Sequence, residues 1–255
     1  MPDLETVLTE THARTRLVRV NRPSRANALD PATDEALRRA LVAADEDPRV
    51  EAIALTGIGR HFCAGADLDS VVATQDGSRD WSSGGGLTGI DGGRWTPRKL
   101  SIALVNGAAV GAGAELALAC DFLIMSSTGY LAFPEATAGV VGGAVVGQRL
   151  VRQLPFRIAL EIVVTGRRLT SDEALRWGLA NAVTEPDDLL EVGLGLAAKL
   201  TKPESAEAIR ATARALGHDA ESTIGDALGR CYPDVEAYVQ SPRMQAAVAR
   251  LASRD

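Results

Sequence analysis

Short apolar runs in the first half of the chain predict a set of buried strands. They lie at 16–20 (RLVRV), 51–56 (EAIALT), 100–105 (LSIALV) and 122–125 (FLIM). Between the first two runs, apolar residues recur at helical spacing after Asp30 and Pro31, a pair typical of a helix start. The chain therefore opens with a β-α-β unit, and the pattern predicts an α/β protein.

The pattern changes after Ala144, where strand signals almost vanish and apolar residues follow helical periodicity. Prolines and glycines divide this part into predicted helices at 144–154, 156–164, 171–177, 187–200, 204–216, 220–231 and 234–251. Ahead of the strand at 100–105, the stretch 74–98 is rich in Gly, Ser and Asp and predicts a loop. Its length and composition fit either disorder or a lid over a substrate.

Composition and charge narrow the class of protein. The 255 residues are 46% hydrophobic and 24% charged, which is typical of a folded chain with a sizeable core. A net charge of -6 with scattered basic residues argues against a nucleic-acid partner. Three cysteines without a close pair predict reduced thiols and no metal site. The polar, acidic opening and the lack of a run of about 18 apolar residues predict a cytoplasmic protein that does not enter a membrane.

The segment 105–121, VNGAAVGAGAELALACD, predicts a strand, a tight turn and a helix that begins near Ala114. The first N–H groups of a helix lack internal partners and lie in positive potential, so such a turn can stabilise a developing oxyanion. A tight helix start with Glu115 favouring the helix dipole is the equally simple alternative.

Two further segments carry candidate residues. In RHFCAGADL (60–68) a strand ends before small residues that would let a ligand lie against the main chain, although a plain turn explains the segment as well. In YLAFPEATAG (130–139) Glu135 leaves a strand end beside glycines, where a carboxylate can enter a cleft; taken alone, it is more simply a surface glutamate. The sequence shows no base or acid paired with Cys63, Cys120 or His61.

Together these segments resemble the enoyl-CoA hydratase/isomerase (crotonase) family over nearly the whole chain. Five segments occur in the family's order and at its spacing: NRPSRANAL (21–29), LTGIGRHFCAGADL (55–68), VNGAAVGAGAELALACD (105–121), FPEATAG (133–139) and TGRRLTSDEALRWGLAN (165–181).

The resemblance implies roles for individual residues. In this family two backbone N–H groups hold the thioester oxygen of a coenzyme A substrate, and Ala64 and Ala112 match them. Hydratases use two glutamates, which match Glu115 and Glu135, 20 residues apart, whereas isomerases generally rely on one. Gly143 matches a residue whose N–H helps to hold the reacting water.

The resemblance also implies a binding site for coenzyme A, which is part of the substrate and not a separate cofactor. The adenine end is expected along residues 64–68, with Arg25 near the phosphates. The matching positions are Arg25, Ala26, Ala64, Gly65, Ala66, Asp67 and Leu68. Apart from the resemblance, Arg25 is most simply a solvated loop charge, and Asp67 could cap the helix that follows it.

The implied architecture is the crotonase fold, a spiral of β-β-α turns. It would occupy residues 1–195, followed over 196–255 by a helical region that mediates homotrimers or dimers of trimers. The chain departs from the family pattern at 142–146, where GGAVV replaces the common Pro-Gly-Ala-Gly-Gly, and at Ala112, where glycine is usual. Val145 and Val146 are therefore expected to reshape the acyl pocket.

The expected activity is that of an enoyl-CoA hydratase, which adds water reversibly across the C2–C3 double bond of an enoyl thioester. The segments 84–89 (GGGLTG) and 165–181 also resemble carnitinyl-CoA dehydratases. The alternatives are an isomerase that uses Glu135 alone, a silent acyl-CoA-binding relative, and a structural trimer that binds no coenzyme A. The two glutamates disfavour the isomerase and the silent relative.

Overall fold

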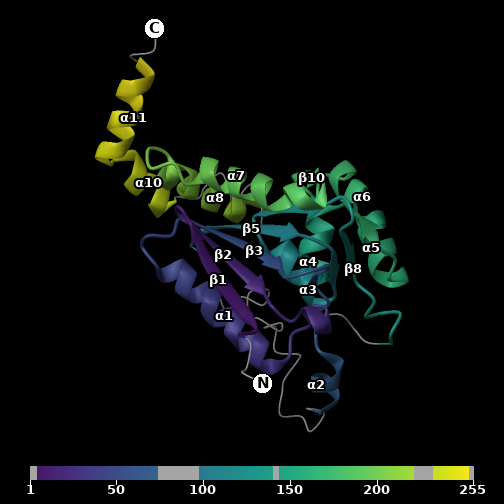
Figure 1. Cartoon of the computed structure of the whole chain (residues 1–255). Helices are drawn as coiled ribbons and strands as arrows, with labels where there is room; N and C mark the ends of the chain where they lie inside the picture. The colour runs from purple at the N-terminus through teal and green to yellow at the C-terminus, as the bar shows by residue number, and fades with distance from the viewer. Residues whose placement is uncertain (1–4, 74–97, 140–143, 221–231, 253–255) are drawn as a thin grey trace.

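A six-stranded sheet runs through the middle of the protein (Figure 1). The computed structural model describes residues 5–73, 98–139, 144–220 and 232–252. Neighbouring strands are parallel except for the β1–β2 hairpin at one edge. In spatial order they are β1 (Val7–His12), β2 (Thr15–Val20), β3 (Ala52–Gly57), β5 (Leu100–Val105), β7 (Phe122–Ser126) and β10 (Ala182–Thr184).

A second sheet is built from short strands, three of which follow long strands of the first sheet. Its order is β4 (His61–Cys63), β6 (Ala108–Val110), β8 (Tyr130–Ala132) and β9 (Leu169–Thr170), with β9 antiparallel to β8. Along the chain β4 follows β3, β6 follows β5 and β8 follows β7. The chain repeatedly passes from a long strand to a short strand and then to a helix, as in β3-β4-α2 and β5-β6-α3. The expected spiral of β-β-α turns is confirmed.

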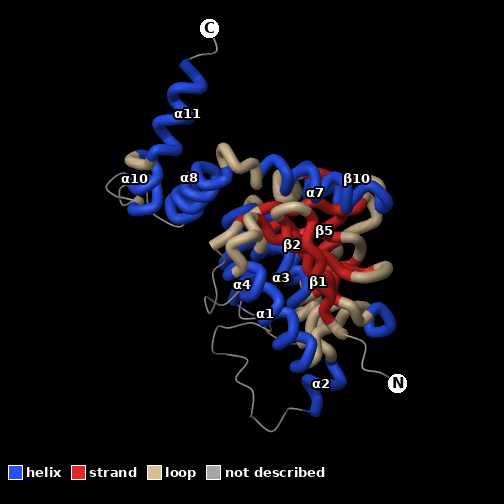
Figure 2. The backbone as a smooth tube through the Cα atoms, turned by 60° about the vertical axis from the view of Figure 1, so that its left-hand side comes forward, coloured by secondary structure: helices blue, strands red, loops and turns tan. Residues whose placement is uncertain are grey.

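Helices cover both faces of the six-stranded sheet (Figures 1 and 2). Helix α1 (Pro31–Glu46) begins as predicted, because the Asp30 carboxylate accepts a hydrogen bond from the Thr33 N–H at 2.8 Å and Pro31 occupies the first turn. The other helical segments are η1 (Pro23–Arg25), α2 (Leu68–Ala73), α3 (Ala112–Ala119), α4 (Ala144–Gln153), α5 (Phe156–Thr165), α6 (Ser171–Arg176), η2 (Pro186–Asp188), α7 (Leu189–Leu200), α8 (Ala206–Ala220), α10 (Pro233–Val239) and α11 (Pro242–Ala252).

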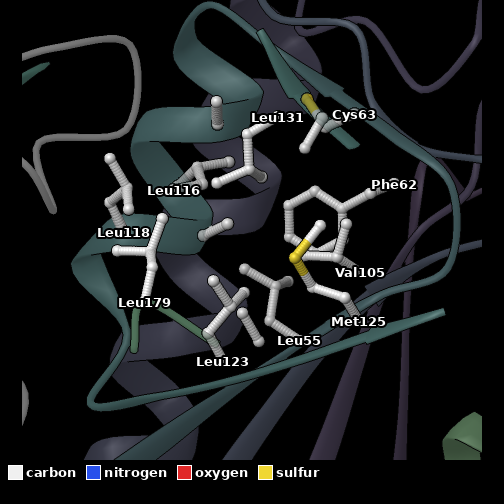
Figure 3. Close-up of a cluster of buried hydrophobic side chains, with 14 of the residues drawn as sticks. Leu55, Phe62, Cys63, Val105, Leu116, Leu118, Leu123, Met125, Leu131 and Leu179 are labelled. Carbon is white, nitrogen blue, oxygen red and sulfur yellow. The ribbon is translucent and has the colours of Figure 1, made fainter. Parts of the chain in front are cut away.

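The central strands β3 and β5 are buried on both faces of the sheet, which explains their continuous apolar residues. One face, together with α1 and α3, forms the larger core, where Phe62 and Met125 pack among leucines and valines (Figure 3). The opposite face packs on α7, with Leu17, Ile102 and Leu104 in the cluster. The second sheet and α3 thereby pack against the six-stranded sheet.

The structure corrects several sequence predictions. The helix predicted at 234–251 is two helices, α10 and α11, because proline at 242 lacks the N–H that would continue the first. Four strands, β1, β6, β9 and β10, were not predicted, since short or half-polar runs carry little periodicity. The predicted helix 220–231 and loop 74–98 lie almost wholly outside the described residues. The division expected at 195/196 lies within α7 and stays a prediction.

Among the described residues no helix is both long enough and apolar enough to span a membrane.

Candidate active site

The turn between β6 and α3 presents the start of a helix without a side-chain cap. Gly111 alone forms this turn, with φ of +53°, a left-handed value that glycine adopts at little cost. Helix α3 begins at Ala112, two residues earlier than the predicted start near Ala114. Ala112 is half-buried, and the N–H of a first helical residue has no partner within its own helix. The turn therefore has the backbone form expected of an oxyanion donor.

The second predicted donor, Ala64, follows β4 in a turn that contains Gly65 at φ +88°. Ala64 is half-buried, and its N–H donates a hydrogen bond to the Ala26 carbonyl at 3.0 Å. Sequence reasoning gave no sign of this acceptor, since the two residues are far apart along the chain. A thioester oxygen would have to share this N–H or displace the carbonyl.

The two turns lie against each other. A Cβ atom added to Gly65 would lie 2.6 Å from the Val110 carbonyl oxygen and 3.3 Å from the Ala112 nitrogen. A Cβ atom added to Gly113 would lie 2.1 Å from the Cys63 carbonyl oxygen. Glycine is required at both positions because the main chains approach so closely, and the segments that carry Ala64 and Ala112 are therefore in contact.

Glu135 reaches the same turn from β8. The register pairs Ala132 with Val110, so the chain leaving β8 runs beside Gly111. An atom at the Cβ position of Gly111 would lie 2.8 Å from Oε1 of Glu135. Glu135 is half-buried, and this burial raises the pKa of its carboxyl group above the ordinary value. The protonated form is thus favoured relative to a glutamate in water.

Glu115 approaches from the helix. It lies in the first turn of α3, its N–H donates to the Gly111 carbonyl at 3.0 Å, and it is only 6% exposed. Charged side chains are rarely buried to this degree without a structural or chemical reason. The structure therefore brings the two predicted glutamates onto segments that meet at Gly111.

The predicted phosphate contact, Arg25, is already paired. Its guanidinium bonds Asp67 at 3.3 Å and also the exposed Asp69. Arg22 bonds the other oxygen of Asp67 at 3.1 Å. Burial opposes the charge on Asp67, but the two arginines outweigh it and lower the pKa of that carboxyl group. Asp67 thus joins two arginine side chains, and no side-chain cap from it to α2 is seen among the described contacts.

The remaining predicted coenzyme A positions surround this ion-pair group. Ala26 and Ala66 are half-buried, while Leu68 is 73% exposed, unusual for a large apolar side chain. Gly143, the predicted water-binding residue, lies outside the described residues, and the side chains of Val145 and Val146 are not described.

The two described cysteines are free, and burial raises the pKa of Cys63 to about 12 and that of Cys120 to about 12. A thiol that stays protonated at neutral pH is a poor nucleophile, which agrees with the absence of a paired base in the sequence.

Sequence reasoning missed two asparagines that hold these turns together. Asn106, at the end of β5, accepts from the Gly57 N–H at 3.2 Å and donates to the Gly59 carbonyl at 2.8 Å. Asn27 binds the neighbouring loop in a similar way. Both asparagines lie in segments that resemble the family. The signal that could have indicated their role was an asparagine among small residues, before or within a turn.

Solved structures of similar architecture define the class of this fold. An enoyl-CoA hydratase from Mycobacterium marinum superposes with a TM-score of 0.87 at 29% sequence identity, covering 98% of this chain and 96% of that one. An enoyl-CoA hydratase from Mycobacterium tuberculosis H37Rv gives the same TM-score of 0.87 and 29% identity. The protein has the crotonase fold.

Sequence comparison names the family. The model of the enoyl-CoA hydratase/isomerase family matches residues 10–230. A probable enoyl-CoA hydratase of Rhizobium meliloti (strain 1021) is 38% identical over 234 residues, covering 88% of this chain and 86% of the relative. A carnitinyl-CoA dehydratase of Salmonella arizonae is 39% identical over 188 residues, covering 72% and 70%. This chain belongs to the enoyl-CoA hydratase/isomerase family.

Proposed function

We propose that this protein is an enoyl-CoA hydratase, a hydro-lyase that adds water reversibly across the C2–C3 double bond of an enoyl-CoA thioester. The observation that carries the proposal is that Glu115 and Glu135 lie on segments that meet at Gly111, next to the half-buried turns of Ala64 and Ala112. An isomerase needs only one such carboxylate to move a proton, whereas hydration uses two acid/base groups.

The chemistry explains why these groups belong together. Attack of water at C3 builds negative charge on the thioester oxygen, and two backbone N–H groups, from Ala64 and Ala112, would stabilise that charge. One carboxylate takes a proton from the water as its oxygen bonds to C3, and a carboxyl group gives a proton to C2. In dehydration the same two groups exchange roles.

We assign water activation to Glu115 and proton delivery to Glu135. The raised pKa of Glu135 supports this assignment, because burial favours the protonated form that a donor needs. Arg25 and the turn 64–68 are proposed to bind the coenzyme A portion of the substrate. Arg25 would leave its carboxylate partners, Asp67 and Asp69, and pair with a phosphate of coenzyme A.

A narrower substrate class is suggested by the relatives. Several that match well are carnitinyl-CoA dehydratases, such as that of Proteus mirabilis (strain HI4320), which is 38% identical over 181 residues. We therefore include carnitinyl thioesters among the candidate substrates. We also propose that the chain forms homotrimers or dimers of trimers.

The test replaces each glutamate by its uncharged isostere. Glu115→Gln and Glu135→Gln should each reduce kcat for hydration of a short enoyl-CoA by about 10²- to 10⁴-fold, because general acid/base groups contribute on this scale. Affinity for a saturated acyl-CoA should change little. Turnover on short, long and carnitinyl enoyl thioesters then identifies the substrate.

A matched control is Glu191→Gln, which alters an exposed glutamate of α7 and should leave turnover unchanged. If both active-site variants lost less than tenfold while chemistry limits the rate, the proposed acid/base pair would be wrong.

A further inference from the structure

The loop 22–28 contains a buried polar side chain that the proposed reaction does not use. Asn27 is 0% exposed and has φ of +58°, and the preceding Ala26 also has a positive φ, +50°. Asparagine tolerates left-handed backbone better than most residues, but alanine does not. Such a conformation persists only where surrounding contacts hold it.

The Asn27 side chain makes those contacts. Its Oδ1 accepts from the Arg22 N–H at 2.9 Å, which closes the loop on itself. Its Nδ2 donates to the Ile58 carbonyl at 3.0 Å and to the His61 carbonyl at 2.6 Å. One end of the amide faces two carbonyl acceptors and the other end faces an N–H donor, which identifies the nitrogen and the oxygen of the Asn27 side chain. Both amide hydrogens are therefore used to hold the turn before β4.

That turn leads directly to the predicted oxyanion donor. His61 begins β4, and Ala64 follows β4 immediately. Beyond Asn27, the Leu29 N–H donates to the Gly65 carbonyl at 2.7 Å, and the Ala64 N–H donates to the Ala26 carbonyl at 3.0 Å. The loop thus contacts both the turn before β4 and the turn after it, and the Asn27 amide makes the side-chain contact with the turn before it.

We propose that Asn27 is a positioning residue for the oxyanion site: its amide fixes the Ala26 carbonyl and the Ala64 N–H relative to each other, so that the N–H can pass from the carbonyl to a thioester oxygen. The inference rests on the proposed function, in which Ala64 is a donor. Asn27 acts through the backbone and touches no substrate atom.

The tight packing behind the amide supports a fixed position. A Cβ atom added to Gly57 would lie 2.5 Å from Nδ2 of Asn27, so the amide has no room to move toward β3. Asn106 also donates to the His61 carbonyl, at 3.3 Å, so loss of the Asn27 amide would remove one of the two asparagine side chains that hold the Ile58 to His61 turn. The Ile58 carbonyl would lose this donor, and the His61 carbonyl would keep only the longer bond. The Ala64 N–H would then be less well placed, which weakens stabilisation of charge and not binding of the thioester.

The test uses Asn27→Gly, which removes the amide but retains a residue suited to positive φ. We expect kcat to fall by about 10- to 100-fold with little change in KM, within the range for a displaced oxyanion donor. The infrared C=O stretch of a bound saturated acyl-CoA, isotope-labelled at the carbonyl, should shift to lower frequency in wild type and shift less in the variant. A purely structural role would lower the melting temperature without changing this frequency.

The control is Asn21→Gly, which makes the same substitution at a side chain that donates only to the Glu5 carbonyl among the described contacts. If Asn27→Gly does not fold, Asn27→Asp decides the question, since a carboxylate keeps the shape and the acceptor but cannot donate to Ile58 and His61. A folded Asn27 variant with the same kcat and the same frequency shift as the wild-type protein would overturn the inference. Turnover by the wild-type protein would still support the proposed function. If wild type itself neither hydrates enoyl-CoA nor shifts the C=O band, the proposed function has failed instead.

Discussion

Ala112 provides a residue-scale test that changes a single backbone N–H. It is the first residue of α3, a position where proline is well tolerated because the N–H has no helical partner. Ala112→Pro should therefore fold, yet kcat should fall by about 10²- to 10³-fold, or about 3–4 kcal/mol, because the proposed oxyanion donor is gone. Ala112→Gly keeps the N–H and should retain substantial activity. A folded proline variant with near-normal kcat would exclude this N–H as a donor.

Arg25, the proposed phosphate contact, is paired with two carboxylates, those of Asp67 and Asp69. Asp69→Asn removes the exposed partner and leaves Asp67 in place. Exposed ion pairs are weak, so KM for an enoyl-CoA should fall by no more than about fivefold at low salt. The gain should shrink as ionic strength rises, because salt screens exposed charges. A gain that persists when Arg25 is also replaced by glutamine would show that Arg25 is not involved.

Glu135 should lower stability at neutral pH, because burial opposes its charged form. Its pKa in the folded protein lies above the ordinary 4.5. Below the pKa that such a group has in the unfolded chain, its full contribution to the free energy of unfolding is present. This contribution is lost as the pH rises through the pKa of the group in the folded protein. Glu135→Gln should therefore melt at a higher temperature than wild type at pH 7 but not at pH 4. Equal differences at both pH values, or the same behaviour in Glu191→Gln, would contradict this reasoning.

At the scale of elements, α7 packs on the sheet through a glycine. A Cβ atom on Gly193 would lie 2.3 Å from Cδ2 of Leu104, which is buried in β5. Gly193→Ala should lower the free energy of unfolding by about 1–3 kcal/mol, because the core beneath it has no spare volume. Gly195, on the same helix, has nothing within 4 Å of its Cβ position.

Gly195→Ala is the matched control, and it should raise the free energy of unfolding by about 0.5–1 kcal/mol through helix propensity alone. Denaturant unfolding at one protein concentration measures both variants. Similar effects of the two substitutions would mean that α7 does not press on Leu104 as the structure indicates.

The short elements around the site could be predicted only in part. The helix at Asp30 and Pro31 and the strand at 100–105 were predicted because capping and apolar periodicity act locally. Strands β6 and β9 have three and two residues, too few for a period to emerge. Their strand conformation depends on pairing with β4 and β8, which are remote in sequence.

At the scale of the whole molecule, one helix carries a row of exposed apolar side chains. Phe156, Leu160 and Val164 are 63%, 45% and 52% exposed and recur every four residues along α5. Contiguous exposed apolar surface commonly marks a protein interface. If the chain assembles through this row, Leu160→Glu should shift the sedimentation mass toward the monomer, whereas Leu160→Met should keep the assembly. A charged variant with an unchanged mass would place the interface elsewhere.

The sequence by itself determined the family, the α/β class and the identity of the candidate acid/base pair. The order and spacing of motifs can be recognised from the sequence without knowledge of contacts in space. Glu115 and Glu135 were predicted from the resemblance to hydratases, and the structure places them on segments that meet at Gly111. The tertiary structure alone decided how neighbouring segments use each other's groups. It gave the Ala64 N–H an acceptor in Ala26, paired Arg25 with Asp67, and joined two loops through Asn27. Hydrogen bonds and ion pairs of this kind depend on distances of about 3 Å between residues remote in sequence, which no local pattern encodes.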